Sequence, residues 1–96
     1  MLSKEIKFLI KTTQYIEKID KWYKEKKISL EEIRVLHTMQ FYYWSEIYFR
    51  YSLFKYSKEE IVERYKEIKE KPSKTFKKEI EKFSKVLPMK EVFTFL

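Results

Sequence analysis

The stretch ISLEEIRVLHTMQFYYWSEIYFRYSLFKY, residues 28–56, decides the fold of this 96-residue chain. It contains no Gly and no Pro, and it holds half of the chain's aromatic residues. Its apolar residues follow two neighbouring stripes at helical spacing, so they cover most of the surface of a helix. A helix that is apolar on nearly all sides is normally buried on nearly all sides. We therefore predict a long helix over residues 30–55 at the centre of the fold, covered by the rest of the chain or by a second copy.

Two serines mark the places where helices begin. Ser29 is followed three residues later by Glu32, and Ser57 is followed in the same way by Glu60. In this pattern, called a capping box, the serine hydroxyl accepts a hydrogen bond from the backbone of the later residue, whose side chain accepts one in return. The first box predicts the start of the central helix, and the second predicts the start of another helix over residues 58–70.

A helix is also predicted before the central one. Residues 4–26 follow Ser3, a good N-terminal cap, and carry apolar residues on two adjacent stripes. The first stripe holds Leu2, Ile6, Leu9, Thr13, Ile16 and Tyr23, and the second holds Phe8, Tyr15, Ile19 and Trp22. The basic run at residues 24–27 closes this helix with positive charge, as the helix dipole prefers.

The C-terminal part of the chain is predicted to be helical as well. Pro72 disfavours a helical residue before it, so the helix over 58–70 must end there, and a further helix follows over 74–86. The tail over 88–96 is too apolar to remain exposed to solvent. We expect a last helical turn or two there, with an extended segment docked on the bundle as the alternative. The predicted fold class is all-α, a compact four-helix bundle in one domain over residues 1–96, with a short C-terminal segment packed on it.

The composition argues against several classes of chemistry. The chain has no Cys, no Gly, one His and one Asp. Without Gly there is no Gly-rich phosphate-binding loop. A single His and a single Asp argue against a His-rich metal site and against a Ser-His-Asp triad. We therefore predict a non-enzymatic protein with no catalytic residues, no cofactor, no metal and no evident small-molecule substrate.

The sequence also bears on location and source. No apolar run is long enough to span a membrane, and the N-terminal residues lack a signal-peptide cleavage pattern. Together with the absence of Cys, this predicts a cytoplasmic protein that does not use a membrane. Lys and Glu are abundant whereas Asn and Cys are absent, a composition typical of hyperthermophiles. We expect the source to be a hyperthermophile or one of its viruses.

Protein–protein contact is the first hypothesis for function. The central helix carries more apolar surface than four helices of this size are expected to cover, which favours self-association as a homodimer. Tyrosine suits such an interface because its ring packs while its hydroxyl stays at the wet rim. The candidate interface residues are Tyr42, Tyr48 and Tyr51. Thr38, Ser45 and Ser52 recur every seven residues, so either another helix approaches closely along them or they form a strip facing solvent.

Charge suggests a second hypothesis, sequence-nonspecific nucleic-acid binding. The chain has a net charge of +7, and its positive charge gathers in residues 1–28 and 71–90. Lysines contact phosphate without reading bases, and the helix over 74–86 offers no Arg, Asn or Gln to read them. The candidate contacts are Lys71, Lys74, Lys77, Lys78, Lys82 and Lys85. The alternative is a solvated surface; the deciding feature is whether these lysines and the basic end of residues 4–26 form one patch, unbroken by Glu79 and Glu81.

His37 is the one histidine, and it lies in the middle of the central helix on an apolar stripe. We expect it to be partly buried and hydrogen-bonded to a neighbouring side chain. The functional alternative is a pH-sensitive contact at an interface, because the pKa of histidine lies close to physiological pH.

Overall fold

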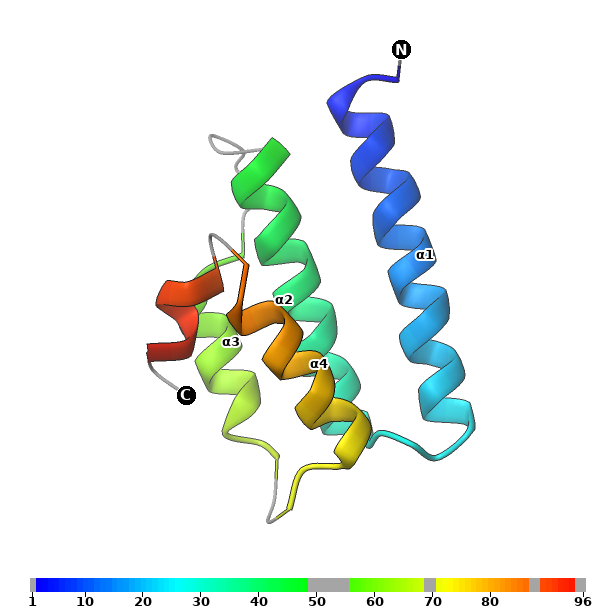
Figure 1. Cartoon of the computed structure of the whole chain (residues 1–96), viewed down its shortest axis with the longest axis vertical. Coiled ribbons are helices and arrows are strands. Elements are labelled where there is room, and N and C mark those ends of the chain that lie inside the picture. The colour runs from blue at the N-terminus through cyan, green and yellow to red at the C-terminus, as the bar shows by residue number, and fades with distance from the viewer. Residues whose placement is uncertain (1, 49–55, 69–70, 87–88, 95–96) are drawn as a thin grey trace.

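A computed structural model describes residues 2–48, 56–68, 71–86 and 89–94 of the chain (Figure 1). These residues form helices α1 (Lys4–Lys24), α2 (Leu30–Tyr48), α3 (Lys58–Tyr65) and α4 (Lys74–Ser84), and a short 3-10 helix, η1 (Met89–Thr94). No strand occurs among the described residues. The prediction of an all-α four-helix bundle with a short C-terminal segment is confirmed.

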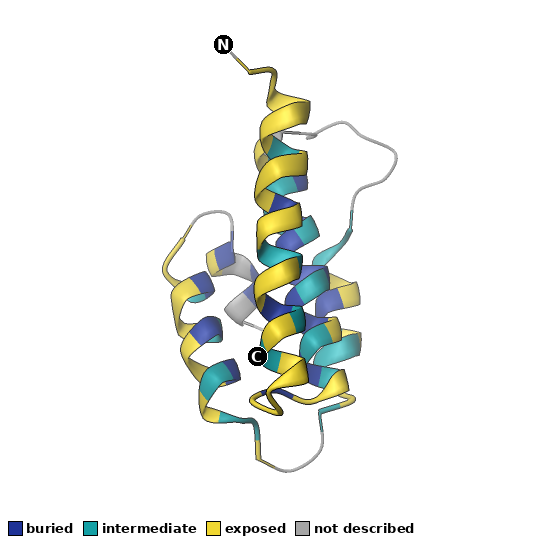
Figure 2. Cartoon of the chain, turned by 90° about the vertical axis from the view of Figure 1, so that its right-hand side faces the viewer, coloured by how far each residue is buried: buried dark blue, intermediate teal, exposed yellow. Residues whose placement is uncertain are grey.

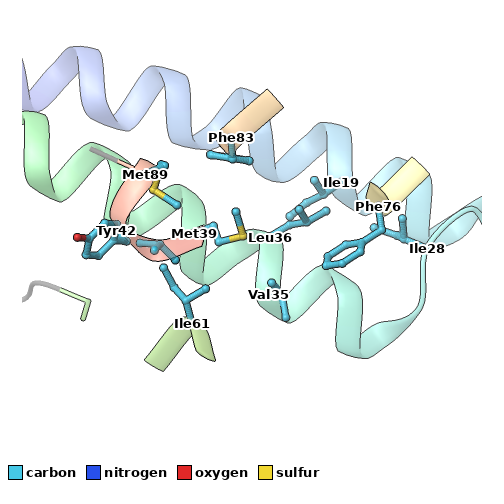
Figure 3. Packing of buried hydrophobic residues seen from close by; sticks show 11 residues of the cluster. Ile19, Ile28, Val35, Leu36, Met39, Tyr42, Ile61, Phe76, Phe83 and Met89 are labelled. Atoms are coloured by element: carbon cyan, nitrogen blue, oxygen red, sulfur yellow. The ribbon is translucent and has the colours of Figure 1, made fainter. Parts of the chain in front are cut away.

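Helix α2 lies at the centre, as its all-round apolar surface predicts. Figure 1 shows it between α1 and α3, with α4 crossing in front of it. No residue from Val35 to Tyr42 is exposed. Four of these residues belong to the hydrophobic core (Figure 3): Val35, Leu36, Met39 and Tyr42. The part of the predicted helix over residues 49–55 lies outside the described residues.

The other elements close around α2 mainly with aromatic and branched side chains. Helix α4 turns the rings of Phe76 and Phe83 inward, and the ring of Phe83 packs edge-on against Tyr15 of α1 and Tyr43 of α2. Aromatic pairs of this kind stabilise a core beyond the area that they bury. The rest of the core comes from α1, the turn after it, α3 and η1: Ile19, Ile28, Ile61, Met89 and Val92. The apolar tail is therefore docked as a short helix, as expected.

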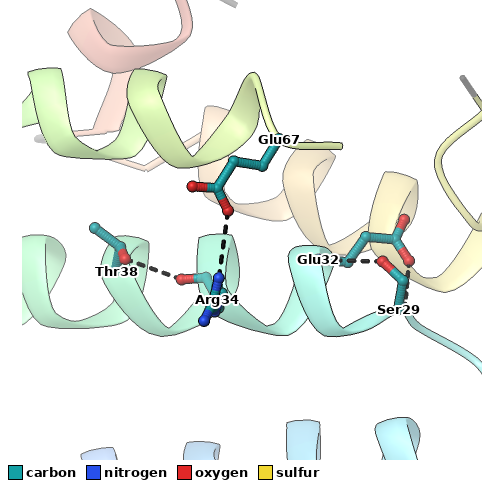
Figure 4. A network of polar contacts seen from close by, with 5 residues as sticks. All are labelled: Ser29, Glu32, Arg34, Thr38 and Glu67. Carbon is teal, nitrogen blue, oxygen red and sulfur yellow. Dashed lines mark hydrogen bonds and ion pairs between the residues drawn. The ribbon is translucent and has the colours of Figure 1, made fainter. Parts of the chain in front are cut away.

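The side chain of Glu32 connects the starts of two helices by hydrogen bonds. The capping box that the sequence predicts is present, because Ser29 N donates to Glu32 Oε1 at 2.8 Å and Glu32 N donates to Ser29 Oγ at 3.1 Å (Figure 4). The second carboxylate oxygen accepts a hydrogen bond from Ser73 N at 2.7 Å. Ser73 is the N-cap of α4, so one buried carboxylate joins the beginning of α2 to the beginning of α4.

Helix α1 ends at Lys24, two residues earlier than predicted, because Lys26 adopts a left-handed backbone with φ of 59°. Lys26 N donates to Tyr23 O at 3.0 Å, and Lys27 N donates to Trp22 O at 2.8 Å. This pair of hydrogen bonds is the Schellman motif, which usually places glycine at the left-handed position. The chain contains no glycine, so a lysine takes that position.

Helices α3 and α4 are also shorter than the predicted ranges 58–70 and 74–86. After Tyr65 and after Ser84 the backbone makes hydrogen bonds over three residues instead of four, for example from Ile68 N to Tyr65 O. Such bonds tighten the last turn of a helix and end it. Pro72 therefore sets an outer limit for α3, whereas the turn that follows Tyr65 decides where it stops.

The strip of small side chains on α2 faces protein. Thr38 and Ser45 are both buried, and each hydroxyl donates to the backbone carbonyl four residues earlier, that of Arg34 and that of Phe41. These internal bonds satisfy the hydroxyls where neighbouring helices cover them. Of the two alternatives for this strip, the solvent-facing one is wrong for both residues. Ser52 lies outside the described residues.

We expect the Glu32→Ala variant to lose about 2–3 kcal/mol of unfolding free energy, because two backbone N–H groups lose their acceptor in a buried place. Glu31→Ala, at the partly exposed neighbouring position of the same helical turn, should cost less than about 1 kcal/mol. Chemical denaturation followed by circular dichroism measures both variants. Equal losses in the two would show that Glu32 acts only through the helix dipole.

Candidate functional site

Of the tyrosines proposed from the sequence as interface residues, the structure describes the side chain of Tyr42 alone. Tyr42 is only 7% exposed and belongs to the core, so the prediction that it lines an interface is wrong. Tyr48 is the last described residue of α2, and Tyr51 lies outside the described residues. The apolar surface of α2 is covered from Val35 to Tyr42 by other elements of the same chain.

Most of the large apolar side chains left exposed among the described residues lie on α1 or just before it, and others are Leu30 and Ile47 of α2 and Val86 after α4. Helix α1 turns its second apolar stripe towards the bundle, where Ile19 is buried and Phe8 packs edge-on against Phe41 of α2. The first stripe faces outward along the side of the molecule that Figure 2 shows. Its large side chains, with that of Ile10 beside them, are 41–60% exposed: Leu2, Ile6, Leu9 and Ile10.

The exposed stripe has a regular spacing. Leu2, Ile6, Leu9 and Thr13 are separated by four, three and four residues; the last three lie on α1 at the spacing of the seam of a coiled coil, and Leu2 comes just before the helix. This order of gaps is the same when it is read from either end. At 3.6 residues per turn, the lysines of this part of the helix lie on the side away from the stripe. We call Leu2, Ile6, Leu9, Ile10 and Thr13 the α1 face.

The lysines proposed for nucleic-acid contact are all exposed: Lys71, Lys74, Lys77, Lys78, Lys82 and Lys85. Glu79 does not interrupt them, because its side chain points into the bundle and the residue is only 4% exposed. Glu81 is exposed. By helical spacing, Glu81 lies at the edge of the row formed by Lys74, Lys78, Lys82 and Lys85.

Two basic segments that are far apart in the sequence meet at one end of the molecule. The turn between α1 and α2 and the segment before α4 lie together at the lower end of Figure 1. They border an open cleft of about 670 Å³, and four lysines line it: Lys24, Lys26, Lys27 and Lys71. The sequence indicates both basic segments, but only the fold brings them to the same cleft. We call this feature the basic cleft.

Two glutamates, Glu31 and Glu32, line the basic cleft together with its four lysines, so the charge of the lining is positive. Lys24 and Lys27 form surface ion pairs, each at 3.1 Å, with Asp20 and Glu25. Exposed pairs of this kind are weak and exchange easily with other partners. Lys26 and Lys71 form no ion pair with another described residue. The carboxylate of Glu32, although it lines the cleft, is already occupied by two backbone N–H groups.

Buried Glu79 serves to connect α4 with α1. Its Oε1 accepts a hydrogen bond from the hydroxyl of Tyr15 at 3.4 Å and lies 3.6 Å from Lys18 Nζ. Lys82 Nζ approaches the other oxygen at 3.8 Å. Burial raises the pKa of the Tyr15 hydroxyl above its usual value, and the charge of Glu79 raises it further. The hydroxyl therefore stays protonated and donates to Glu79.

His37 of α2 is partly buried, as the sequence predicts, but the predicted hydrogen bond to a neighbouring side chain is not made at Nε2. Its ring packs edge-on against Phe41, and its Nε2 has no hydrogen-bond partner in the described part of the chain. Burial lowers its pKa, the positive charge of Arg64 lowers it further, and Asp20 acts in the opposite direction. His37 is therefore held in its neutral form in the folded protein.

Comparison of the chain with protein-family models, curated proteins and solved structures finds no match in any of the three. The described residues bring together no group of three or more His, Cys, Asp or Glu side chains that could hold a metal ion. None of the described helices is both long and apolar enough to span a membrane.

We expect Glu79→Ala to lower the unfolding free energy by about 1–3 kcal/mol, because it leaves the buried hydroxyl of Tyr15 without its acceptor. The matched control is Glu81→Ala, two residues along the same helix on the exposed side, which should change stability by no more than about 0.5 kcal/mol. Thermal and urea denaturation compare the two variants. A loss at Glu79 no larger than that at Glu81 would contradict the proposed connection.

The unfolding free energy should fall as the pH drops below about 6.5. His37 has its ordinary pKa of about 6.5 in the unfolded chain and a lower pKa in the folded protein, so the unfolded chain binds the proton more readily. The unfolding free energy is expected to be highest above that pH and to decline from about pH 6.5 to pH 5. His37→Gln should have a flat profile in this window, because the chain has no other histidine. Urea titrations at several pH values test this, and equal slopes in both proteins would overturn it.

Proposed function

We propose that this protein is a small non-enzymatic helical protein that acts through protein–protein contact, and that the contact pairs two copies of the chain through the α1 face. The single observation that carries the proposal is the exposure of Ile6, Leu9 and Ile10 on one side of the first two turns of α1, with Leu2 exposed just before the helix. A contiguous apolar patch of this kind is a common mark of an interaction site.

The spacing of the α1 face favours a helix as the partner. Side chains separated by alternating gaps of four and three residues form a straight seam along a helix, into which the side chains of a second helix fit. A flat lipid surface needs an apolar side but does not need this repeat. The α1 face also has a fixed position, because Phe8 and Ile19 pack the second apolar stripe of α1 against the bundle.

The palindromic spacing favours a second copy of the same chain. In a two-fold symmetric contact, the same patch is used on both partners. An antiparallel pair of α1 helices would place Ile6 against Leu9 of the other copy, and Leu2 against Thr13. Lys4, Lys7 and Lys11 lie on the side of the helix away from this seam, so the pairing would bury none of their charges.

The proposal is tested by measuring the mass in solution by light scattering and analytical ultracentrifugation at micromolar concentrations. We expect twice the monomer mass for the unmodified chain and the monomer mass for the double variant Ile6→Gln, Leu9→Gln. The matched control is Lys4→Gln with Lys11→Gln, which introduces the same residues on the lysine side of the same helix. The control should remain a dimer, because it leaves the apolar seam intact.

Three results would overturn the proposal. The first is a monomer across the whole concentration range in the unmodified chain. The second is a dimer that persists in the Ile6→Gln, Leu9→Gln variant while its helical circular dichroism is unchanged, since the contact would then lie elsewhere. The third is a monomer that binds phosphatidylglycerol vesicles through Ile6 and Leu9, because the α1 face would then meet a lipid surface instead of a second copy.

A further inference from the structure

The basic cleft continues into the outer face of α4. Lys71 lines the cleft together with Ser73, and Lys74 is the next residue and the first of the helix. From there Lys78 and Lys82 follow at one-turn intervals, with Lys85 close to the same line. The lysines of the cleft and the row of Lys74, Lys78, Lys82 and Lys85 therefore form one basic path, whereas Lys77 lies outside it, beyond Glu81.

The length of this path suits a nucleic-acid backbone. From Lys74 to Lys85 the helix rises by about 16 Å. A nucleic-acid strand presents a phosphate about every 3.4 Å of axis in a duplex, so a segment of this length carries several negative charges. The inward position of Glu79 leaves Glu81 as the acidic residue on the exposed side of α4, and it lies at the border of the path.

Apolar residues and one aromatic residue also line the basic cleft. Tyr23 is 41% exposed and lines the cleft beside Ile28 and Ile68. The cleft volume of about 670 Å³ falls in the range of sites that bind small planar ligands. An aromatic ring next to lysines is the combination on which single-stranded nucleic acids stack a base while their phosphates are neutralised.

We propose that the basic cleft and the outer face of α4 form a binding surface for single-stranded nucleic acid. The lysines of α4 contact successive phosphates, and Lys26 and Lys71 hold the phosphates that flank a base stacked on Tyr23 inside the cleft. A base paired in a duplex cannot leave its stack without unpairing, so the cleft favours a single strand. Lysine contacts read no base edges, and the binding is therefore independent of sequence.

The first test measures binding to a fluorescent 20-nucleotide single strand and to the matching duplex by anisotropy over a range of salt concentrations. We expect tighter binding to the single strand and an affinity that falls linearly with salt on logarithmic axes. Lys26→Gln with Lys71→Gln should lower the affinity at low salt about tenfold and reduce the slope by about 1.4, the value for two lost phosphate contacts.

The matched control for charge is Lys7→Gln with Lys11→Gln. These lysines are exposed and lie about 20–25 Å along α1 from the cleft, and the variant has the same net charge as the cleft variant. Its affinity should stay within about twofold of the unmodified chain. Equal losses in the two variants would mean that binding follows net charge alone, and no binding at low salt would mean that the lysines are a solvated surface. Either result overturns the proposal.

The second test separates the base from the phosphates. Tyr23→Leu keeps the cleft apolar but removes the ring, and it should weaken binding of the single strand about fivefold or more while leaving the duplex unaffected. Tyr23→Phe keeps the ring and should stay within about twofold. If Tyr23→Leu has no effect on the single strand, or weakens both nucleic acids equally, no base enters the cleft and the proposed preference for single strands is wrong.

Discussion

The carboxylate of Glu32 connects the start of α2 with the start of α4, and the arrangement of the two halves of the chain depends on this connection. It accepts hydrogen bonds from Ser29 N at the start of α2 and from Ser73 N at the start of α4, and it is almost fully buried. A buried carboxylate is stable only when its oxygens are occupied, so these two helix starts must come together. Because the turn after α1 leads into one of them and Lys71 precedes the other, this one group also assembles the basic cleft.

The covering of α2 from Val35 to Tyr42 has a consequence for α1. The core needs only one apolar side of each outer helix, and α1 carries two apolar stripes. The stripe with Phe8 and Ile19 is used for packing, so the α1 face, which includes Leu9, has no place in the interior of this chain. Because the chain has no glycine and no alanine, its helices can approach each other closely at few points. Large apolar side chains that do not fit between the helices must pack elsewhere.

The two proposed surfaces lie at opposite ends of α1 and do not compete. The α1 face occupies the first three turns, whereas the basic cleft begins where the helix ends at Lys24. An antiparallel pair joined through the α1 faces would leave both clefts accessible, with their α4 lysines in solvent. Two binding surfaces joined in this way hold a long strand more tightly than either alone, because the second contact becomes intramolecular.

The sequence by itself determined where the helices begin and which helix lies at the centre. Capping boxes are local, so Ser29 with Glu32 predicts a helix start without knowledge of the fold. The all-round apolar surface of α2 likewise has no stable place except the interior. Helix ends were less predictable, because Lys26 takes a left-handed position that usually belongs to glycine. Only the tertiary structure decided which stripe of α1 faces outward, that Tyr42 is core, and that Glu79 points inward to Tyr15. These outcomes depend on contacts between segments far apart in the chain, and the spacing of residues along one helix does not contain that information.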